Sequence, residues 1–300
     1  MGNSALKQRK LNLVNFISSG GLEIGGAGVR GHRPTMEDRH LICDVSNHTI
    51  VAVFDGHGGS GAAQYASENF VSTLEQNPIW KSYITKTDGH DNETDPKTIG
   101  DALISVFEEI DIQLRIKQSE HNFIDSSGCT ACVTMITPYY IICANAGDSR
   151  CILGSLSVTL SMSNDHKPTN FKEKNRIVEA GGCVQNNRVD GNLAVSRALG
   201  DFFSKEREDL PARSQKVSCI PEIIFHKRTD GDEVIILACD GLWDVMTSNE
   251  VLKFVRKKIF KKGILDPRIL CEELIDNSLR RGTQDNVSVI VVKLPGLKTE

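Results

Sequence analysis

Two strongly apolar runs near the C-terminus, VIILACD and VSVIVVKL, place the tightest limits on how this chain can fold. Asp240 closes the first run, Asp285 opens the second, and the residues between them predict two helices. If each helix runs the length of the domain, two helices return the chain to the end that it left. The two strands are then antiparallel, with Asp240 and Asp285 at the same end. The pattern favours antiparallel sheets with helices outside them over a doubly wound parallel sheet.

The ends of those two helices carry their own sequence signals. Ser248 is placed to cap VLKFVRKKIF, and this helix is expected to end at Gly263. The next helix begins at Asp266–Pro267, because proline is favoured in the first turn, and it ends at Gly282. The C-terminal region is therefore predicted to be a strand, two helices and a strand.

The rest of the chain alternates short runs rich in β-branched residues with helical stretches and shows no internal repeat. The strand candidates are LEIGGAGVR, HLICDV, TIVAVFD, CTACVTMI, YYIICANA, SRCILG, PEIIFH, DEVIILACD and NVSVIVVKL. Helices are predicted over 59–76 and 99–120, where apolar residues recur at helical spacing. Asn170 with Glu173 resembles a capping box before a further helix. The predicted fold class is α+β.

We interpret residues 23–295 as a single domain, because no stretch has the composition of an interdomain linker. The polar and basic start MGNSALKQRK is expected to lie outside the core, so residues 1–22 are assigned to an N-terminal arm. Residues 296–300 are assigned to a C-terminal tail. Two polar segments are predicted to lie on the surface, a loop over 85–98 and a flap at about 202–220.

Composition and charge argue against several classes of function. The net charge of −4 gives no electrostatic reason to expect a nucleic acid as a partner. No apolar run approaches a membrane span and the start lacks a secretory signal, so the protein is expected in the cytosol or nucleus. The nine cysteines do not have the spacing of a disulfide framework. They are therefore interpreted as small buried hydrophobic residues of a protein in a reducing compartment. The C-x-x-C pair Cys129 and Cys132 lies in an apolar run with no second pair at zinc spacing, which favours the same structural role.

Three aspartates stand at the edges of core strands: Asp55 after IVAVF, Asp240 after VIILAC and Asp285 before VSVIVV. One such residue is usually a turn former or a helix cap. Three together indicate a cluster whose members repel one another unless cations neutralise them. The acidic neighbours of these three are Glu37, Asp38, Asp148 and Asp244. Oxygen ligands without a His or Cys cluster favour Mg²⁺ or Mn²⁺ over zinc, and two such cations suit hydrolysis of a phosphate ester.

Three further residues suit phosphate chemistry. Gly56 has no side chain, so its carbonyl can approach a cation closely. Arg33 precedes Glu37 by four residues, which lets a phosphate-binding guanidinium and a metal ligand share one loop. His57 follows Asp55 by two residues and is placed to donate a proton to a leaving alkoxide. A lone arginine is more often a surface residue and a lone histidine a core residue, so both assignments depend on the neighbouring carboxylates.

Eight motifs follow one another along about residues 23–293. In chain order they are RPTMEDRH, VFDGHGG, SGCTA, NAGDSR, DHKP, VDGNLAVSRALGDF, ACDGLWDV and GTQDNVSVIVV. This ordered set resembles the metal-dependent serine/threonine protein phosphatases of type 2C. The resemblance implies a sandwich of two antiparallel sheets flanked by helices on both faces, with the metals at one end. It also implies that the partners are phosphorylated protein substrates.

The resemblance further implies a role for each candidate site residue. Asp55 would bridge two Mn²⁺ or Mg²⁺ ions, and a hydroxide held by both ions would attack phosphoserine or phosphothreonine without a covalent intermediate. Arg33 would hold the substrate phosphate, His57 would be the general acid, and Asp38 would be a carboxylate close to the metals. The implied ligands are Glu37 and the Gly56 carbonyl for one metal, Asp240 and Asp285 for the other, and Asp148 and Asp244 for a weaker third.

Every position that this mechanism needs is filled, which favours an active enzyme over a catalytically weak phosphoprotein-binding scaffold of the same fold. The sequence has no Cys-x-x-x-x-x-Arg run for a cysteine phosphatase and no G-x-x-x-x-G-K for a nucleotide-binding loop. A metal nuclease would be expected to carry a basic face, which the net charge does not favour.

The N-terminus suggests a modification site. Met1–Gly2 followed by Asn3 and Ser4, with basic residues nearby, suggests myristoylation of Gly2, although the usual pattern has Ser or Thr where this chain has Leu6. An unmodified start is the equal alternative. We expect a monomer, and association with a membrane only if Gly2 carries the lipid.

Overall fold

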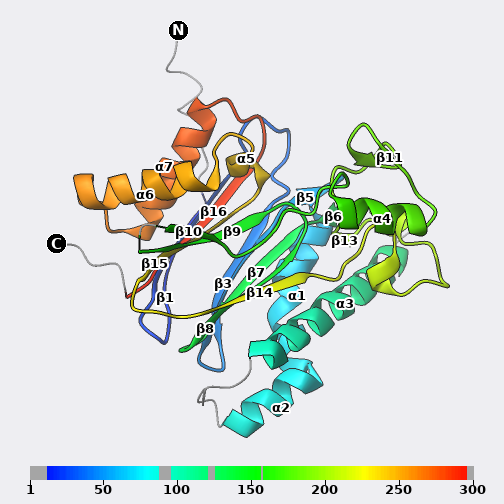
Figure 1. Cartoon of the computed structure of the whole chain (residues 1–300), viewed down its shortest axis with the longest axis horizontal. Coiled ribbons are helices and arrows are strands. Elements are labelled where there is room, and N and C mark those ends of the chain that lie inside the picture. The colour runs from blue at the N-terminus through cyan, green and yellow to red at the C-terminus, as the bar shows by residue number, and fades with distance from the viewer. Residues whose placement is uncertain (1–11, 88–95, 121–125, 157, 296–300) are drawn as a thin grey trace.

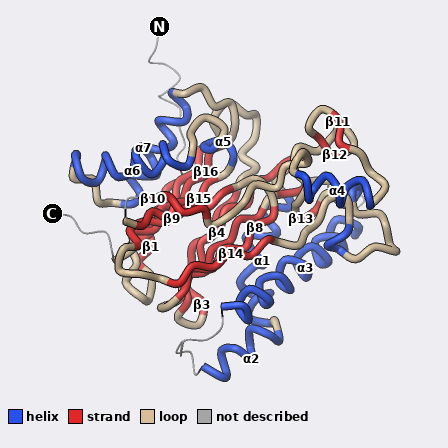
Figure 2. Tube along the Cα trace, viewed as in Figure 1, coloured by secondary structure: helices blue, strands red, loops and turns tan. Residues whose placement is uncertain are grey.

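The computed structural model describes residues 12–87, 96–120, 126–156 and 158–295 of the 300-residue chain. Its two main sheets stack face to face, and helices cover the outer face of each, which gives four layers (Figure 1, Figure 2). Every strand pair described in the two sheets is antiparallel. This arrangement confirms the predicted α+β sandwich with helices on both faces.

The first sheet has six strands in the order β1-β2-β16-β15-β9-β10. Its strands are β1 (Asn12–Ile17), β2 (Glu23–Val29), β9 (Arg150–Ser155), β10 (Val158–Ser161), β15 (Asp232–Ala238) and β16 (Val287–Lys293). Its outer face is covered by α5 (Asp240–Trp243), α6 (Ser248–Lys262) and α7 (Pro267–Arg280). β15 and β16 are neighbours, with Ala238 opposite Val289, so the antiparallel pairing predicted from the two intervening helices is confirmed.

The second sheet has five strands in the order β14-β8-β7-β4-β3. Its strands are β3 (Arg39–Val45), β4 (His48–Phe54), β7 (Ala131–Ile136), β8 (Tyr140–Ala146) and β14 (Glu222–Lys227). Its outer face is covered by α1 (Gly61–Gln76), α2 (Pro78–Thr87) and α3 (Pro96–Glu120). The apolar stripe predicted on the third helix is buried there, including Phe107 and Ile110.

A smaller lobe lies beside one end of the sandwich (Figure 1). Its elements are α4 (Phe171–Glu179), β11 (Val184–Gln185), β12 (Arg188–Val189), β13 (Leu199–Gly200) and the 3₁₀ helices η2 (Phe202–Ser204) and η3 (Ala212–Ser214). β13 joins the lobe to the sandwich, because it pairs with β6 (Gly128–Cys129), which pairs in turn with β5 (Gly56–His57). The lobe and the strand ends that carry the candidate site are therefore connected by backbone hydrogen bonds.

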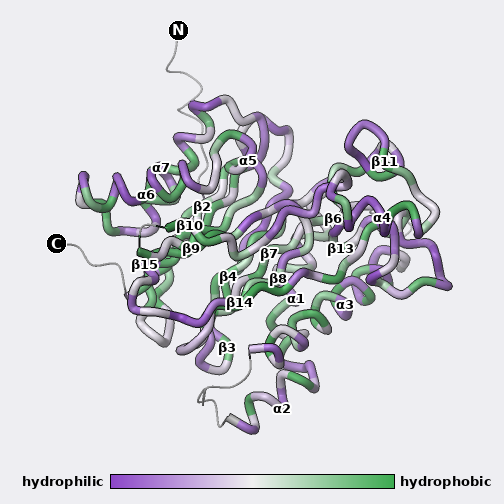
Figure 3. The backbone as a smooth tube through the Cα atoms, viewed as in Figure 1, coloured by the Kyte–Doolittle hydropathy of each residue, from purple (hydrophilic) through white to green (hydrophobic). Residues whose placement is uncertain are grey.

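Burial on both faces explains why the central strands read as continuous apolar runs. On β4, Ile50, Ala52 and Phe54 face the helices, while Val51 and Val53 face the other sheet. Side chains of a strand alternate between its faces, so both sets are buried. Figure 3 shows the hydrophobic colours gathered on these strands and more hydrophilic colours on the lobe around α4 and β11. None of the helices in the described part of the chain has the length and apolar character that crossing a membrane requires.

Two predicted boundaries are wrong. The arm assigned to residues 1–22 includes β1, which pairs along its length with β2 and extends the first sheet. Its side chains alternate between exposed and half-buried, which is the weak signal of an edge strand. The loop predicted over 85–98 is helical at both ends, because α2 continues to Thr87 and α3 begins at Pro96. Residues 88–95 of that loop lie outside the described residues.

The caps of the C-terminal helices agree with the sequence except at one residue. Thr247, and not Ser248, caps α6, and its hydroxyl and the Glu250 side chain form a reciprocal capping box. Gly263 ends this helix in the left-handed region, at φ 65°. Asp266 caps α7 by accepting a hydrogen bond from a backbone N–H in the first turn, as predicted.

The capping box predicted at Asn170 and Glu173 is wrong. Asn170 precedes α4, but its side chain makes no capping hydrogen bond. Glu173 is buried instead and accepts hydrogen bonds from Arg176 at 2.6 Å and from Arg197 at 2.8 Å. Two half-buried guanidinium groups need a carboxylate more than the helix end does, since water caps an exposed helix end at little cost.

Candidate metal centre

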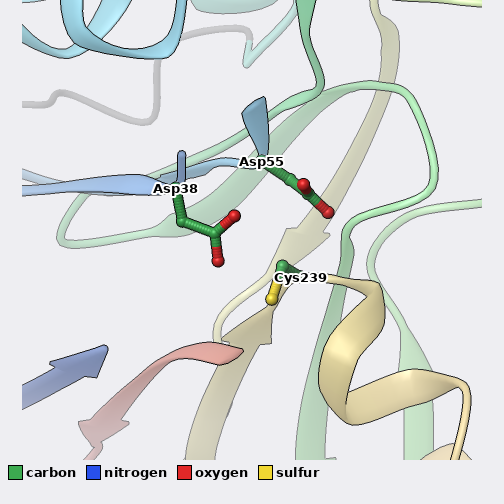
Figure 4. Close-up of side chains that lie close together, drawn as sticks. All are labelled: Asp38, Asp55 and Cys239. Carbon is green, nitrogen blue, oxygen red and sulfur yellow. The ribbon is translucent and has the colours of Figure 1, made fainter. Parts of the chain in front are cut away.

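The loops at one end of the sandwich enclose a polar cavity of about 340 Å³. The sequence-predicted residues that line it are Arg33, Glu37, Asp55, Gly56, His57, Asp148, Asp240 and Asp285. Asp38 is 3% exposed and lies beside Asp55, beneath the cavity lining (Figure 4). Asp244 lines an adjoining groove that shares Arg33 and Asp285 with the cavity. The structure thus brings all the predicted carboxylates to one end of the fold.

Each aspartate of the cavity lies close to the end of a core strand. Asp55 follows β4, and Asp148 lies in the turn between β8 and β9. Asp240 begins α5 two residues after β15 ends, and Asp285 comes two residues before β16. Because β15 and β16 are antiparallel, the end of one lies beside the start of the other, and Asp240 and Asp285 meet.

Asp55 belongs to two groups of possible ligand atoms, each with all its atoms within 4.8 Å of one another. Asp55, Asp148 and Asp240 form the group that lines the cavity. Asp38, Asp55 and Cys239 form the deeper group (Figure 4). Burial raises the pKa of the Cys239 thiol well above its usual value, so the thiol stays protonated and does not suit a hard cation. The all-carboxylate group is therefore the one that fits Mg²⁺ or Mn²⁺.

Burial and mutual repulsion raise the pKa values of the clustered carboxyls. Burial raises the pKa of Asp38 to about 6, and burial together with the charge of Asp148 raises the pKa of Asp240 to about 7. Burial and the charges of Asp38 and Asp240 raise the pKa of Asp55 well above its usual value. The buried Oδ2 atom of Asp38 has no hydrogen-bond partner in the described part of the chain. A bound cation would relieve this excess of negative charge, so the donor set fits a divalent cation.

Glu37 and Gly56 are held against each other at the cavity. The Glu37 N–H donates to Oδ1 of Asn286 at 2.8 Å, and its carboxylate accepts from the Gly59 N–H at 3.3 Å. A Cβ atom at Gly56 would lie 2.5 Å from the carbonyl oxygen of Glu37. Any side chain at this position would push the two segments apart, so the close approach itself requires glycine.

Two positively charged side chains reach the carboxylates. Arg33 donates from Nη2 to Oδ2 of Asp285 at 2.6 Å, and its side chain remains 58% exposed. Lys167 makes an ion pair with Oδ2 of Asp148. The hydrogen bond and the charge of Asp285 raise the pKa of Arg33. A charged and largely exposed guanidinium at the cavity is suited to bind an incoming phosphate.

His57 is held by a buried carboxylate. Its Nε2 atom lies 2.7 Å from Oδ2 of Asp201, which follows β13 and has a left-handed backbone conformation with φ 52°. Burial lowers the pKa of His57, but the hydrogen bond and the charge of Asp201 outweigh burial and raise it overall. The imidazole is therefore biased toward the protonated form that a general acid needs.

Sequence reasoning missed four residues that shape the cavity: Asp201, Lys167, Asn286 and Arg188. Asn286 is buried, and its amide also donates to the carbonyls of Arg30 and Thr35, which fixes the loop that carries Arg33 and Glu37. The motifs SRALGDF, DHKP and TQDN contain Asp201, Lys167 and Asn286, so the signal was present. No local pattern connects them to the carboxylates.

Cys129 and Cys132 are buried and free. Burial raises the pKa of the Cys129 thiol well above the usual range, and the hydrogen bond between Cys132 and Cys143, together with burial, raises that of Cys132. Their placement in β6 and β7 agrees with the predicted structural role.

Comparison with known proteins places this site in a family. The family model "Protein phosphatase 2C" matches residues 22–287. A probable protein phosphatase 2C of Caenorhabditis elegans is 38% identical over 281 residues, which cover 90% of this chain and 74% of the relative. Protein phosphatase 2C homolog 3 of Schizosaccharomyces pombe is 38% identical over 286 residues, which cover 90% of this chain and 64% of that protein.

The fold is also found in a solved structure. The crystal structure of a phosphatase from a pathogenic strain of Toxoplasma gondii superposes with a TM-score of 0.78 at 23% identity, covering 98% of this chain and 97% of that one. The chain therefore belongs to the protein phosphatase 2C family, and it is an enzyme of the serine/threonine protein phosphatase class.

Proposed function

We propose that the cavity binds two divalent cations, Mn²⁺ or Mg²⁺, and that the enzyme uses them to release phosphate from phosphoserine and phosphothreonine in proteins. The observation that carries this proposal is the group of Asp55, Asp148 and Asp240 in one cavity with the guanidinium of Arg33. Carboxylate oxygens suit both cations, and a guanidinium suits a phosphate. Cations bound there would activate a water molecule and offset the charge of the phosphoryl oxygens.

Asp55 would contact both cations, because its carboxylate lines the cavity and belongs to the all-carboxylate group with Asp148 and Asp240. Asp38 would fix the orientation of Asp55 from the protein side, where it is buried beside it. The other proposed ligands are Glu37 and the Gly56 carbonyl for one cation, Asp240 and Asp285 for the second, and Asp148 and Asp244 for a weaker third.

The remaining residues would act on the substrate. Arg33 would orient the phosphate, since its guanidinium is exposed at the cavity and already held by Asp285. His57 would protonate the leaving serine or threonine oxygen, because it lines the same cavity and Asp201 favours its charged form. General acid help matters for these substrates, whose alkoxide leaving groups are strongly basic.

A phosphopeptide assay with metal titration tests the proposal. Phosphate release from a phosphothreonine peptide should require Mn²⁺ or Mg²⁺, stop on addition of EDTA, and return when the cation is restored in excess. Release that EDTA does not affect would contradict the cation site. Tight peptide binding without release at saturating Mn²⁺ would support the scaffold alternative, which no observation on the described residues favours.

The proposed partners are phosphorylated proteins, and the acidic net charge argues against nucleic acid. We further propose a monomer of the cytosol or nucleus, to be tested by light scattering and by cell fractionation. Gly2 lies outside the described residues, and its myristoylation stays a prediction. A gain in intact mass of the protein from its native cells, lost in a Gly2→Ala variant, would demonstrate it.

A further inference from the structure

Lys167 brings a positive charge into the carboxylate cluster. Its Nζ atom makes an ion pair with Oδ2 of Asp148, whose side chain is only 4% exposed. Across the described ranges of the chain, no other lysine or arginine makes an ion pair with Asp148, Asp55 or Asp240. The Lys167 side chain is 38% exposed and paired with a carboxylate, so its ammonium is charged at neutral pH.

The backbone holds Lys167 beside Asp148 without help from the ion pair. The N–H of His166 donates to the carbonyl of Gly147 at 2.9 Å, and the N–H of Gly147 donates to Nδ1 of His166 at 3.3 Å. These two residues precede Lys167 and Asp148 directly, so the two short segments lie side by side. The ammonium therefore starts from a backbone position fixed next to its partner.

The same loop is anchored at a second point. Both carboxylate oxygens of Asp165 accept hydrogen bonds from Arg150 at the start of β9, at 3.0 Å and 2.8 Å. The N–H of Ser196 also donates to the carbonyl of His166 at 3.0 Å. Because the backbone of this loop is fixed, only the side-chain torsions of Lys167 must be ordered when it pairs with Asp148.

We propose that Lys167 competes with a divalent cation for the carboxylate of Asp148 and so sets the affinity of the weakest cation site. This inference rests on the cation-binding function proposed above. A cation bound through Asp148 must displace the ammonium or lie close to it, and both cost Coulomb energy. The site at Asp148 would then fill only at high cation concentration, while the sites at Asp55, Asp240 and Asp285 are already occupied.

A purely structural ion pair leads to a different expectation. If Lys167 only fastens its loop, removing the ammonium lowers stability and leaves cation binding unchanged. If Lys167 instead orients Asp148 as a ligand, removing it weakens cation binding. Competition alone predicts tighter binding after the charge is lost.

The test compares the full-length wild type with Lys167→Met and Lys167→Arg. Lys216→Met is the matched control, because Lys216 makes an ion pair with Asp190 at 2.8 Å in the lobe and does not line the cavity. Each protein is stripped with a chelator and titrated with Mn²⁺ in the absence of substrate. Free Mn²⁺ is measured by electron paramagnetic resonance, which reports binding and not activity.

We expect Lys167→Met to tighten the weakest Mn²⁺ site about tenfold, a gain reduced by the partial solvent exposure of the lysine. Lys167→Arg and Lys216→Met should bind Mn²⁺ like the wild type, since in each variant a positively charged side chain still pairs with Asp148. In an Asp148→Asn background, Lys167→Met should bring no gain, because the shared partner has lost its charge.

Unchanged or weaker Mn²⁺ binding by Lys167→Met would overturn the competition. A wild type that binds no Mn²⁺ would contradict the proposed function instead, so the two failures are distinguishable. If thermal unfolding shows that Lys167→Met is not folded, Lys167→Gln, which keeps a polar side chain, is measured in its place with the same expected gain.

Discussion

The Nε2 atom of His57 lies 2.7 Å from Oδ2 of Asp201, although the two residues are 144 positions apart in the sequence. The Asp201 side chain is 1% exposed and that of His57 is 31% exposed, so a buried carboxylate holds the ring while the ring itself lines the cavity. Asp201 is positioned in turn by its neighbour, because the Gly200 N–H donates to Oδ1 of Asp111 on α3 at 2.8 Å. A carboxylate that is hydrogen-bonded to a histidine fixes the orientation of the imidazole ring and favours its charged form.

We expect Asp201→Asn to lower the turnover of a phosphothreonine peptide by about tenfold or more. Asparagine tolerates the left-handed backbone of this position, so the change removes mainly the charge. Asp201 raises the pKa of His57, so its loss lowers that pKa. The alkaline limb of the pH–rate profile, where the acid loses its proton, should therefore move to lower pH.

Asp190→Asn is the matched control, since Asp190 also has a left-handed backbone and pairs with Lys216 away from the cavity. An unchanged alkaline limb in Asp201→Asn would show that Asp201 does not set the protonation of His57.

His57→Gln should slow hydrolysis of a phosphoserine peptide by about a hundredfold or more, and hydrolysis of an aryl phosphate much less. An aryl oxide is a far weaker base than an alkoxide and leaves with little protonation. The measurement is kcat on both substrates at saturating Mn²⁺, so that metal binding does not limit either rate. An equal decrease in kcat on the two substrates would show that His57 is not the general acid.

The parts of the fold that sequence could predict are those with a local or periodic signal. Continuous apolar runs identified β4 and β15, and the residues Gly263 and Asp266 marked helix ends that the structure confirms. The antiparallel pairing of β15 and β16 followed from counting the helices between them. The edge strand β1 was missed because its side chains are mostly exposed, which leaves no apolar pattern to read.

The candidate site was predictable only where its residues stand at strand ends. Asp55 and Asp240 each follow a strongly apolar run, so their sequence context indicates their place. The pairings His57–Asp201 and Lys167–Asp148 depend on how the lobe folds against the sandwich. No spacing rule connects such residues, because tertiary packing and not the local chain sets their distance.

Asp240→Asn should weaken Mn²⁺ binding by at least about tenfold and lower activity severely at limiting Mn²⁺. The change removes one charged oxygen from the group that Asp240 forms with Asp55 and Asp148. Because burial and the charge of Asp148 raise the pKa of Asp240 to about 7, protons compete with the cation below that pH. Wild-type Mn²⁺ affinity should therefore rise between pH 6 and pH 8.

Asp230→Asn, at an exposed position in the loop before β15, controls for loss of charge alone. Calorimetric Mn²⁺ titration at three pH values measures both effects. Normal affinity and activity of Asp240→Asn at limiting Mn²⁺ would exclude this residue as a ligand.

Glu173→Gln should destabilise the fold by about 3 kcal/mol at pH 7, because Glu173 is buried and its loss leaves the half-buried guanidinium groups of Arg176 and Arg197 without a counter-charge. Burial alone would raise the pKa of Glu173, but the hydrogen bond and charge of Arg197 and the charge of Arg176 outweigh burial and lower it to about 2 from 4.5. A carboxyl whose pKa is lower in the folded than in the unfolded state contributes its full stabilisation when the pH is above its pKa in the unfolded state. That contribution is then lost as the pH falls from about 4.5 toward 2.

The stability difference between wild type and Glu173→Gln should therefore shrink by about 1 kcal/mol between pH 7 and pH 4, as the unfolded wild type begins to take up its proton. Urea unfolding of both proteins across that range measures the difference. Glu179→Gln, at an exposed position of the same helix α4, should unfold like the wild type at every pH. A difference for Glu173→Gln that stays constant from pH 7 to pH 4 would mean that the ion pairs do not lower the pKa of Glu173 in the folded protein.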